Sequence, residues 1–246
     1  MDKHAKQLAR LQHELADKRQ GTASGRYLAD FIFGANDGLV TTFAVVAGAQ
    51  GAHLAPFTVL IFGLANLLAD GLSMGLGNYL GQRSEVDYQR RQRLGEIEEI
   101  EKFPEMEKEE VEEIFRRWGF TPPLLQEAAR TITADKKRWV DFMMREELGV
   151  IEDHPASPAR RGLATFVAFA AAGMVPLIPY LLRLSGVAAV QASIVMTATA
   201  MFAVGASRSR LTVQKWYWGG LQMLLVGGSA AVAAYAVGFL VERWIS

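Results

Sequence analysis

Glutamate side chains on an apolar helix face are the residues of this sequence that most clearly predict chemistry. A helix over residues 105–118 places four apolar side chains on one stripe: Val111, Ile114, Phe115 and Trp118. Glu107 and Glu110 lie on that stripe or at its edge. A carboxylate on a buried face is costly unless it is paired or binds a metal. We therefore interpret both residues as candidate metal ligands.

A second predicted helix, over residues 139–148, also places a glutamate on an apolar face, and this face carries methionine sulfur. Trp139, Val140, Met143 and Met144 form its apolar stripe, and Glu147 projects between the two methionines. Thioether sulfur beside carboxylate oxygen favours a transition metal, because Mg²⁺ and Ca²⁺ prefer shells of oxygen alone. Without Glu147, the methionine pair would be interpreted as core filler.

Most other acidic residues of the segment 82–150 fit a solvated helix surface. Long Glu/Lys/Arg helices are usually exposed and carry ion pairs between successive turns. This interpretation covers Glu98, Glu101, Glu105, Glu109, Glu112 and Glu113. Glu96 and Glu99 are less clear, since each lies one turn before an apolar residue, Ile100 or Phe103.

Five apolar segments are long enough to cross a bilayer, which takes about 20 residues. Their ranges are 28–50, 56–80, 162–184, 187–207 and 217–243. Pro176 and Pro179 should kink or break the third. The predicted fold is all-α, with five transmembrane helices and a small helical cytosolic domain between the second and third.

The sequence predicts a division of the 246-residue chain into four parts. Residues 1–25 form a cytosolic amphipathic helix, and 26–81 a transmembrane hairpin. Residues 82–158 form the predicted cytosolic metal-binding domain, with helices starting near Ser84, Pro104, Pro122-Pro123 and Ala134. The first of these helices either starts anew or continues the second span. Residues 159–246 hold the last three spans. Lys and Arg gather beside the predicted domain and in the loop 208–215, which places both in the cytoplasm.

Polar side chains inside the first two spans are candidate pathway residues, because such residues are rare and usually functional. The first span carries Asp30, Asn36 and Asp37. The second carries a stripe at every fourth position: Asn66, Asp70, Met74 and Asn78. Gly63, Gly71 and Gly75 lie beside this stripe and would let another helix approach closely. Alternatively, Asn36 and Asp37 hydrogen-bond a broken helix beside Gly34 and Gly38, and Asp30 is solvated at a membrane end.

Composition excludes several classes of function. The formal net charge is zero, so no nucleic-acid partner is implied. The absence of cysteine removes disulfides, thiolate metal sites and cysteine nucleophiles. The polar N-terminus does not resemble a cleavable signal peptide. A di-iron oxidase needs Glu-x-x-His pairs, which do not occur.

Four motifs stand out along the chain: GANDGLVTTFAVVAGAQGA, ADGLSMGLGNYLGQRSE, DFMMREELG and MVPLIPY. Together they resemble the vacuolar iron transporter (VIT) family. The resemblance covers nearly everything after residue 25 and implies a five-helix homodimer that exchanges Fe²⁺ or Mn²⁺ for protons and moves metal out of the cytosol. It implies cytosolic ligands at Glu96, Glu99, Glu107, Glu110, Met143, Met144 and Glu147, and pathway residues at Asp37 and Met74.

Two positions depart from the family pattern. Asn66 and Arg26 stand where the family often has glutamate, and Asp70 lies one turn after Asn66. Both departures bear on metal uptake or proton coupling. The short loops favour a bacterial-type member in an inner membrane.

The expected function is therefore a transporter of divalent transition metal, not an enzyme. The expected cargo is Fe²⁺, with Mn²⁺, Co²⁺, Ni²⁺ or Zn²⁺ as alternatives, and no other cofactor is expected. The competing hypothesis is a membrane-anchored metal sensor or buffer without transport, for which Asp37 and Met74 would be dispensable.

Overall fold

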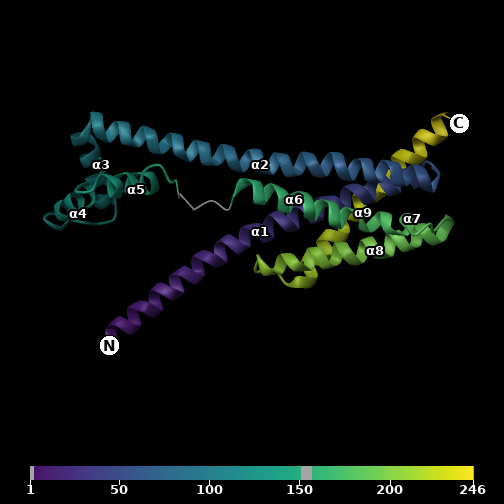
Figure 1. Cartoon of the computed structure of the whole chain (residues 1–246), viewed down its shortest axis with the longest axis horizontal. Helices are drawn as coiled ribbons and strands as arrows, with labels where there is room; N and C mark the ends of the chain where they lie inside the picture. The colour runs from purple at the N-terminus through teal and green to yellow at the C-terminus, as the bar shows by residue number, and fades with distance from the viewer. Residues whose placement is uncertain (1–2, 151–156, 246) are drawn as a thin grey trace. The chain divides into compact units, whose positions relative to one another are not determined.

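The computed structural model describes residues 3–150 and 157–245, and the side chains of residue 25 and from residue 27 onward within those ranges. Every element there is helical, as predicted (Figure 1). The elements are α1 (Lys3–Gly51), α2 (Pro56–Lys102), α3 (Pro104–Arg117), α4 (Leu124–Thr133), α5 (Lys136–Glu146), α6 (Pro158–Gly173), η1 (Val175–Leu177), α7 (Ile178–Leu181), α8 (Gly186–Ser207), η2 (Arg208–Arg210) and α9 (Trp216–Ile245).

The described residues contain five stretches that are long and apolar enough to cross a membrane, which confirms the predicted number. They are Tyr27–Gly51, Pro56–Lys102, Pro158–Leu181, Gly186–Arg210 and Trp216–Ile245. A helix of 47 residues is about 70 Å long, more than twice a bilayer's hydrocarbon core. The apolar residues 56–80 of α2 therefore form its membrane-crossing part, and the highly charged remainder lies beyond it.

The chain divides into two compact units, Leu80–Pro155 and the remainder. The predicted division into four parts stays a prediction. One expectation about helix boundaries was wrong, because residues 3–25 do not form a separate helix. Instead, α1 runs without a break into the first span. The side chains of residues 1–24 and of Arg26 lie outside the described set, so the predicted amphipathic face is not tested.

Glycines let the membrane-crossing helices approach closely. A Cβ atom at Gly34 or Gly38 of α1 would clash with the backbone of Thr165 or Phe169 on α6. Because these residue numbers rise together, α1 and α6 run parallel. Gly71 and Gly75 of α2 face Phe166 of α6, as the prediction of a close approach beside the polar stripe required.

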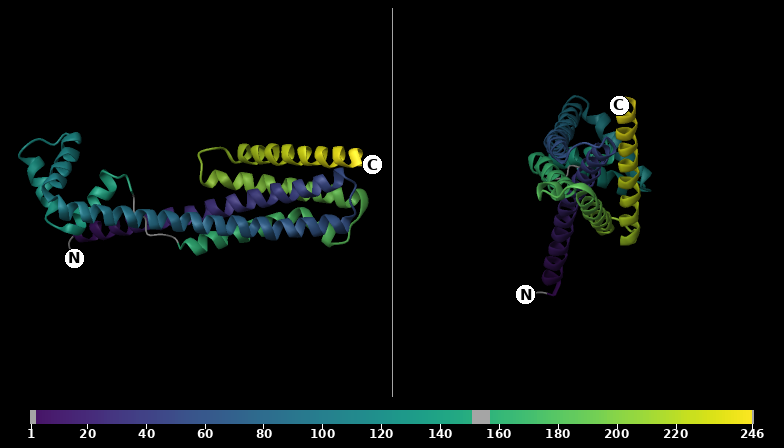
Figure 2. Two further views of the ribbon diagram at one scale, coloured as in Figure 1. Left: turned by 90° about the horizontal axis from the view of Figure 1, so that it is seen from above. Right: turned by 90° about the vertical axis from the view of Figure 1, so that its right-hand side faces the viewer.

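The remaining spans complete an alternating arrangement (Figure 2). Gly63 of α2 meets Leu177, whereas Gly75 meets Gly162, so α2 runs antiparallel to the third span. Gly205 of α8 meets Gly219 of α9, at the turn that makes these two helices antiparallel. Odd-numbered and even-numbered spans thus run in opposite directions, as five successive crossings require.

The third span is broken at its prolines, as predicted. Helix α6 ends at Gly173, and Pro176 and Pro179 lie in the short elements η1 and α7 that follow. A proline has no N–H and clashes with the preceding turn, which stops a regular helix. The hydroxyl of Ser193 donates a hydrogen bond of 2.8 Å to the Pro176 carbonyl, which satisfies one freed acceptor.

The unit Leu80–Pro155 folds around its own hydrophobic core. Pro104 occupies the first turn of α3, and Gly119, at φ +90°, follows its end. The side chain of Asp135 caps α5 by accepting a 2.8 Å hydrogen bond from the Arg138 N–H. The core consists of Ile100, Val111, Ile114, Phe115, Leu125, Ala129, Trp139, Val140, Phe142, Met143 and Met144.

One member of the predicted apolar stripe does not belong to this core. Trp118 is 52% exposed, because α3 ends at Arg117 and the chain turns away there. Its ring still contacts Phe115 and Phe142 edge-on.

Candidate metal site

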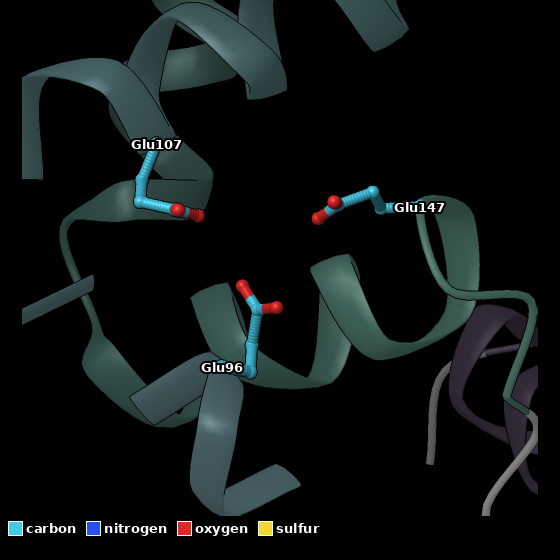
Figure 3. Close-up of side chains that lie close together, drawn as sticks. All are labelled: Glu96, Glu107 and Glu147. Carbon is cyan, nitrogen blue, oxygen red and sulfur yellow. The ribbon is translucent and has the colours of Figure 1, made fainter. Parts of the chain in front are cut away.

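Three carboxylates from separate segments of the chain converge in the unit Leu80–Pro155. Glu96 lies near the end of α2, Glu107 in α3, and Glu147 directly after α5 (Figure 3). One oxygen of each lies within 4.8 Å of the other two. Metal–oxygen bonds to transition metals are roughly 2.0–2.2 Å long. The three oxygens therefore need only a small shift to close around one divalent ion.

Two of these carboxylates are buried, and one oxygen of each lacks a hydrogen-bond partner. Glu96 and Glu107 are each 2% exposed. Oε1 of Glu96 and Oε2 of Glu107 are buried and have no hydrogen-bond partner within the described residues. Leaving such an atom unpaired costs free energy, which a bound cation would return. The prediction that Glu107 lies on the apolar face of its helix is confirmed.

The electrostatics of the site are those of crowded, desolvated acids. Burial, reinforced by Glu147, Glu107, Glu99 and Glu110, raises the pKa of Glu96 to about 8. Burial and the neighbouring glutamates likewise raise the pKa of Glu107 to about 7. Near neutral pH these two groups therefore hold protons that an arriving cation must displace.

Glu147 differs from the other two in its exposure. The expectation that it projects from a buried helix face was wrong, because α5 ends at Glu146 and Glu147 is solvent-exposed. Desolvation of its carboxyl, with Glu110 and Glu99, still raises its pKa. Solvent screens its charge more than it screens those of Glu96 and Glu107. Glu147 therefore marks the open side of the cluster.

The other four predicted ligands surround this cluster less directly. Glu110 is half-buried and Glu99 exposed, and both act on the pKa values of the central glutamates. Met143 and Met144 are fully buried in the hydrophobic core. The assignment of all seven residues as ligands stays a prediction.

The glutamates predicted to be solvated behave accordingly. Exposed ion pairs join Glu98 to Lys102, Glu101 to Lys136, Glu105 to Lys108 and Glu113 to Arg116. Such pairs contribute little to stability.

A hollow in the membrane-crossing unit brings the predicted pathway residues of α1 and α2 together. It measures ≈ 570 Å³ and is lined by Ala29, Asp30, Phe33, Asp37, Met74, Gly77 and Asn78. Asp37 and Met74 lie on neighbouring helices and are half-buried. A carboxylate and a thioether at one hollow are donors that suit a transition metal.

Further along the same two helices lies a second hollow of ≈ 520 Å³. Its lining includes Asn66 and Asp70 of the predicted stripe. The side-chain nitrogen of Asn66 is buried and has no hydrogen-bond partner in the described part of the chain. Asn36 is half-buried and lines neither hollow.

Asp30 is not solvated, so that alternative was wrong. The residue is 8% exposed and forms an ion pair with Arg161 of α6 at 2.6 Å. Sequence reasoning missed Arg161 and its neighbour Thr165. The only signal was a basic residue at the start of a predicted span, which is common and is normally attributed to the membrane surface.

Most of the chain matches a known family. A model described as the VIT family matches residues 28–239. The chain belongs to the VIT family. Relatives include "Vacuolar iron transporter 1" of Arabidopsis thaliana, which is 34% identical over 89% of this chain and 88% of its own length. "Vacuolar iron transporter" of Centaurea cyanus is 33% identical over 89% and 90%. That of Toxoplasma gondii is 36% identical over 89% and 76%.

Membership of the VIT family establishes the broad class of this protein. Its relatives are named as transporters, not enzymes, and they are named for iron. Together with the five apolar helices, this identifies an integral membrane protein and supports metal transport as its activity.

Proposed function

We propose that this chain moves a divalent transition metal, Fe²⁺ first and Mn²⁺ second, out of the cytosol in exchange for protons. The observation that carries the metal assignment is the convergence of Glu96, Glu107 and Glu147, two of them with buried, unpartnered oxygens. When ionised in this largely desolvated position, these acids repel one another. A divalent cation is the partner that such an arrangement accepts.

The unit Leu80–Pro155 acts as the collecting domain in this proposal. Glu99 and Glu110 join the central three glutamates, and five carboxylates exceed what one divalent ion needs, so more than one ion binds. Met143 and Met144 supply soft contacts after a side-chain rearrangement from their core positions. The protein needs no resident cofactor, because the metal is its cargo.

The pathway follows the face shared by α1 and α2. Metal binds first at Asp37 and Met74, which line one hollow, and then passes Asp70 and Asn66, which line the next. Asp70 supplies the carboxylate that the family often has at the position of Asn66. Asn36, half-buried beside Asp37 on α1, is included as a further pathway residue.

Proton exchange is supported by the chemistry of the collecting site. Because Glu96 and Glu107 hold protons near neutral pH, metal binding releases protons there. Protons from the far side then compete with the metal for Asp37 and expel it. The departures at Asn66 and Arg26 affect the number of protons exchanged.

The proposed orientation places the collecting domain in the cytoplasm. Arg161, Arg208, Arg210 and Lys215 lie at the end of the membrane-crossing unit from which that domain begins. The opposite end carries only His53, Arg183 and Arg243 as basic residues. The positive-inside rule therefore favours a cytoplasmic collecting domain. We propose a bacterial inner membrane as the site, although the relatives are named vacuolar.

A homodimer is proposed as the working assembly. Ala65, Ala69, Ser73 and Gly77 form an exposed line of small residues on α2, beside both hollows. Small residues let two membrane helices approach closely, and a two-fold axis there would enclose the pathway. If chemical cross-linking in native membranes detects only monomers, the homodimer proposal is contradicted.

The decisive experiment measures Fe²⁺ flux into proteoliposomes that contain a metal-quenched dye, with and without a pH gradient. Asp37→Asn should reduce the initial rate at least about tenfold, since the variant keeps the shape but loses the charge. Asp87→Asn, an exposed carboxylate of α2, is the control and should transport normally.

The outcomes separate the candidate functions. Flux that requires Asp37 and accelerates with the pH gradient supports proton-coupled export. Flux that requires Asp37 but has the same rate with and without the pH gradient contradicts metal–proton exchange and indicates uniport. Full flux in Asp37→Asn contradicts the pathway, and absence of flux from wild type that still binds metal favours the sensor or buffer.

A further inference from the structure

A buried polar cluster joins three helices beside the hollow that contains Asp37 and Met74. Nε of Arg161 donates to Oδ2 of Asp30 at 2.6 Å, and Nη2 donates to Oδ1 at 3.0 Å. The side-chain nitrogen of Asn78 also donates to Oδ1 of Asp30, at 3.2 Å, and to the hydroxyl of Thr165 at 2.7 Å. Both oxygens of Asp30 are therefore occupied by donors.

This cluster lies in the wall of the proposed metal pathway. Asp30 and Asn78 line the same hollow as Asp37 and Met74. The hollow thus has two carboxylates in its wall, and among the side chains that the structure describes, only that of Asp30 pairs with a positive charge. The side chains of Asp30 and Arg161 are 10% and 17% exposed, so solvent does little to weaken their attraction.

We propose that Arg161 is a tethered counter-cation that keeps Asp30 from binding the transported metal, so that the metal is held in this hollow by Asp37 and released. A pathway must bind its ion strongly enough to admit it and weakly enough to let it leave. Two free carboxylates would hold a divalent ion too long. Arginine suits this task because it stays charged and presents two parallel donors to a carboxylate.

This inference rests on the proposed function, since it assumes that metal passes Asp37. It differs from two other interpretations of the same cluster. If Asp30 were a metal ligand, Arg161 would be a competitor that leaves during each cycle. If the cluster only fastened α1, α2 and α6 together, its loss would lower stability and leave the affinity for metal unchanged.

The test is a double-mutant cycle in full-length protein, with Arg161→Gln, Asp30→Asn and the double variant D30N/R161Q. Initial rates of Fe²⁺ flux into proteoliposomes give KM and kcat, and thermal melts in detergent report folding. Arg161→Gln exposes a second carboxylate and should lower both KM and kcat at least about tenfold. Asp30→Asn removes the carboxylate that neutralises Arg161 across the hollow, so the remaining positive charge should repel metal and raise KM.

The double variant gives the sharpest result, because it removes both charges and keeps both shapes. It should restore KM and kcat to within about threefold of wild type. A KM that stays raised in the double variant would make Asp30 a metal ligand and overturn the proposal. Unchanged KM in all folded variants would leave only a structural fastening and would also overturn it.

Arg161→Lys keeps the test valid if Arg161→Gln does not fold. Lysine retains the charge but loses the paired donors, so KM should fall in the same direction by a smaller factor. An unchanged or raised KM in Arg161→Lys contradicts the proposal. Failure of the proposed function itself is distinguishable, because wild type would then not transport or would transport without Asp37.

Discussion

At the scale of single residues, the central fact is that two buried acids have pKa values near or above neutrality. Burial penalises the charged forms of Glu96 and Glu107, and neighbouring carboxylates add to the effect. The folded, metal-free protein thus carries a strain that grows with pH, and a bound cation removes it. A site of this kind lowers the stability of the metal-free protein and raises its affinity for metal.

Glu107→Gln should therefore stabilise the metal-free collecting domain at pH 8 by roughly 2–3 kcal/mol. The folded pKa, about 7, exceeds the ordinary value of 4.5. Below pH 4.5 the carboxyl is protonated in both the folded and the unfolded state, so it costs no stability there. The free energy of unfolding then falls as the pH rises through 7. Glutamine does not ionise, so the variant does not lose this stability as the pH rises. Hydrogen exchange of the amides in α3, measured at pH 5 and pH 8, reports this difference after correction for intrinsic rates.

Glu109→Gln is the matched control on the same helix, since Glu109 is exposed and should leave exchange unchanged at both pH values. Fe²⁺ should slow exchange in wild type and have little effect in Glu107→Gln. Equal pH dependence of wild type and Glu107→Gln would show that this carboxyl is not strained.

At the scale of helices, close glycine contacts decide which faces of the spans meet. The periodicity of α2 predicted that Gly63, Gly71 and Gly75 would admit another helix, and they face the third span. That contact turns the stripe of Asn66, Asp70 and Met74 to one side, where it lines the hollows with α1. The packing face of a helix therefore determines where its polar face points.

Gly38→Ala should lower the midpoint of thermal unfolding, because the added methyl group would clash with the backbone of Phe169. Overpacking of this kind costs about 1–3 kcal/mol. Gly228→Ala in α9 is the control, since nothing lies within 4 Å of the added atom. Melting of purified protein in detergent measures both variants, and an unchanged midpoint for Gly38→Ala would contradict the close packing of α1 on α6.

At the scale of the whole molecule, the alternating directions of the spans have a topological consequence. The loop before α9 and the loop between α1 and α2 must lie on opposite sides of the membrane. The chain contains no cysteine, so single cysteines can be introduced without removing others.

Lys215→Cys and His53→Cys should therefore be labelled from opposite sides by a membrane-impermeant maleimide. In right-side-out bacterial vesicles, His53→Cys should react and Lys215→Cys should react only after the membrane is opened. Labelling of both cysteines in sealed vesicles would contradict the five-span topology, and the reverse pattern would contradict the proposed orientation.

Local signals in the sequence determined the number of spans, the break at Pro176 and the buried position of Glu107. Helix periodicity and the backbone limits of proline act over a few residues, so they can be read from the chain. The metal-ligand assignment of Glu96 and Glu99 came from family resemblance, because periodicity alone left both open.

Only the tertiary structure decided which side chains meet. Glu96 lies in α2, Glu107 in α3 and Glu147 in the turn after α5, and Asp30 and Arg161 are 131 residues apart in sequence. It also placed Glu147 in solvent and the two methionines in the core. Periodicity gives the face on which a residue lies, but the partner across that face depends on how helices pack, which long-range contacts determine.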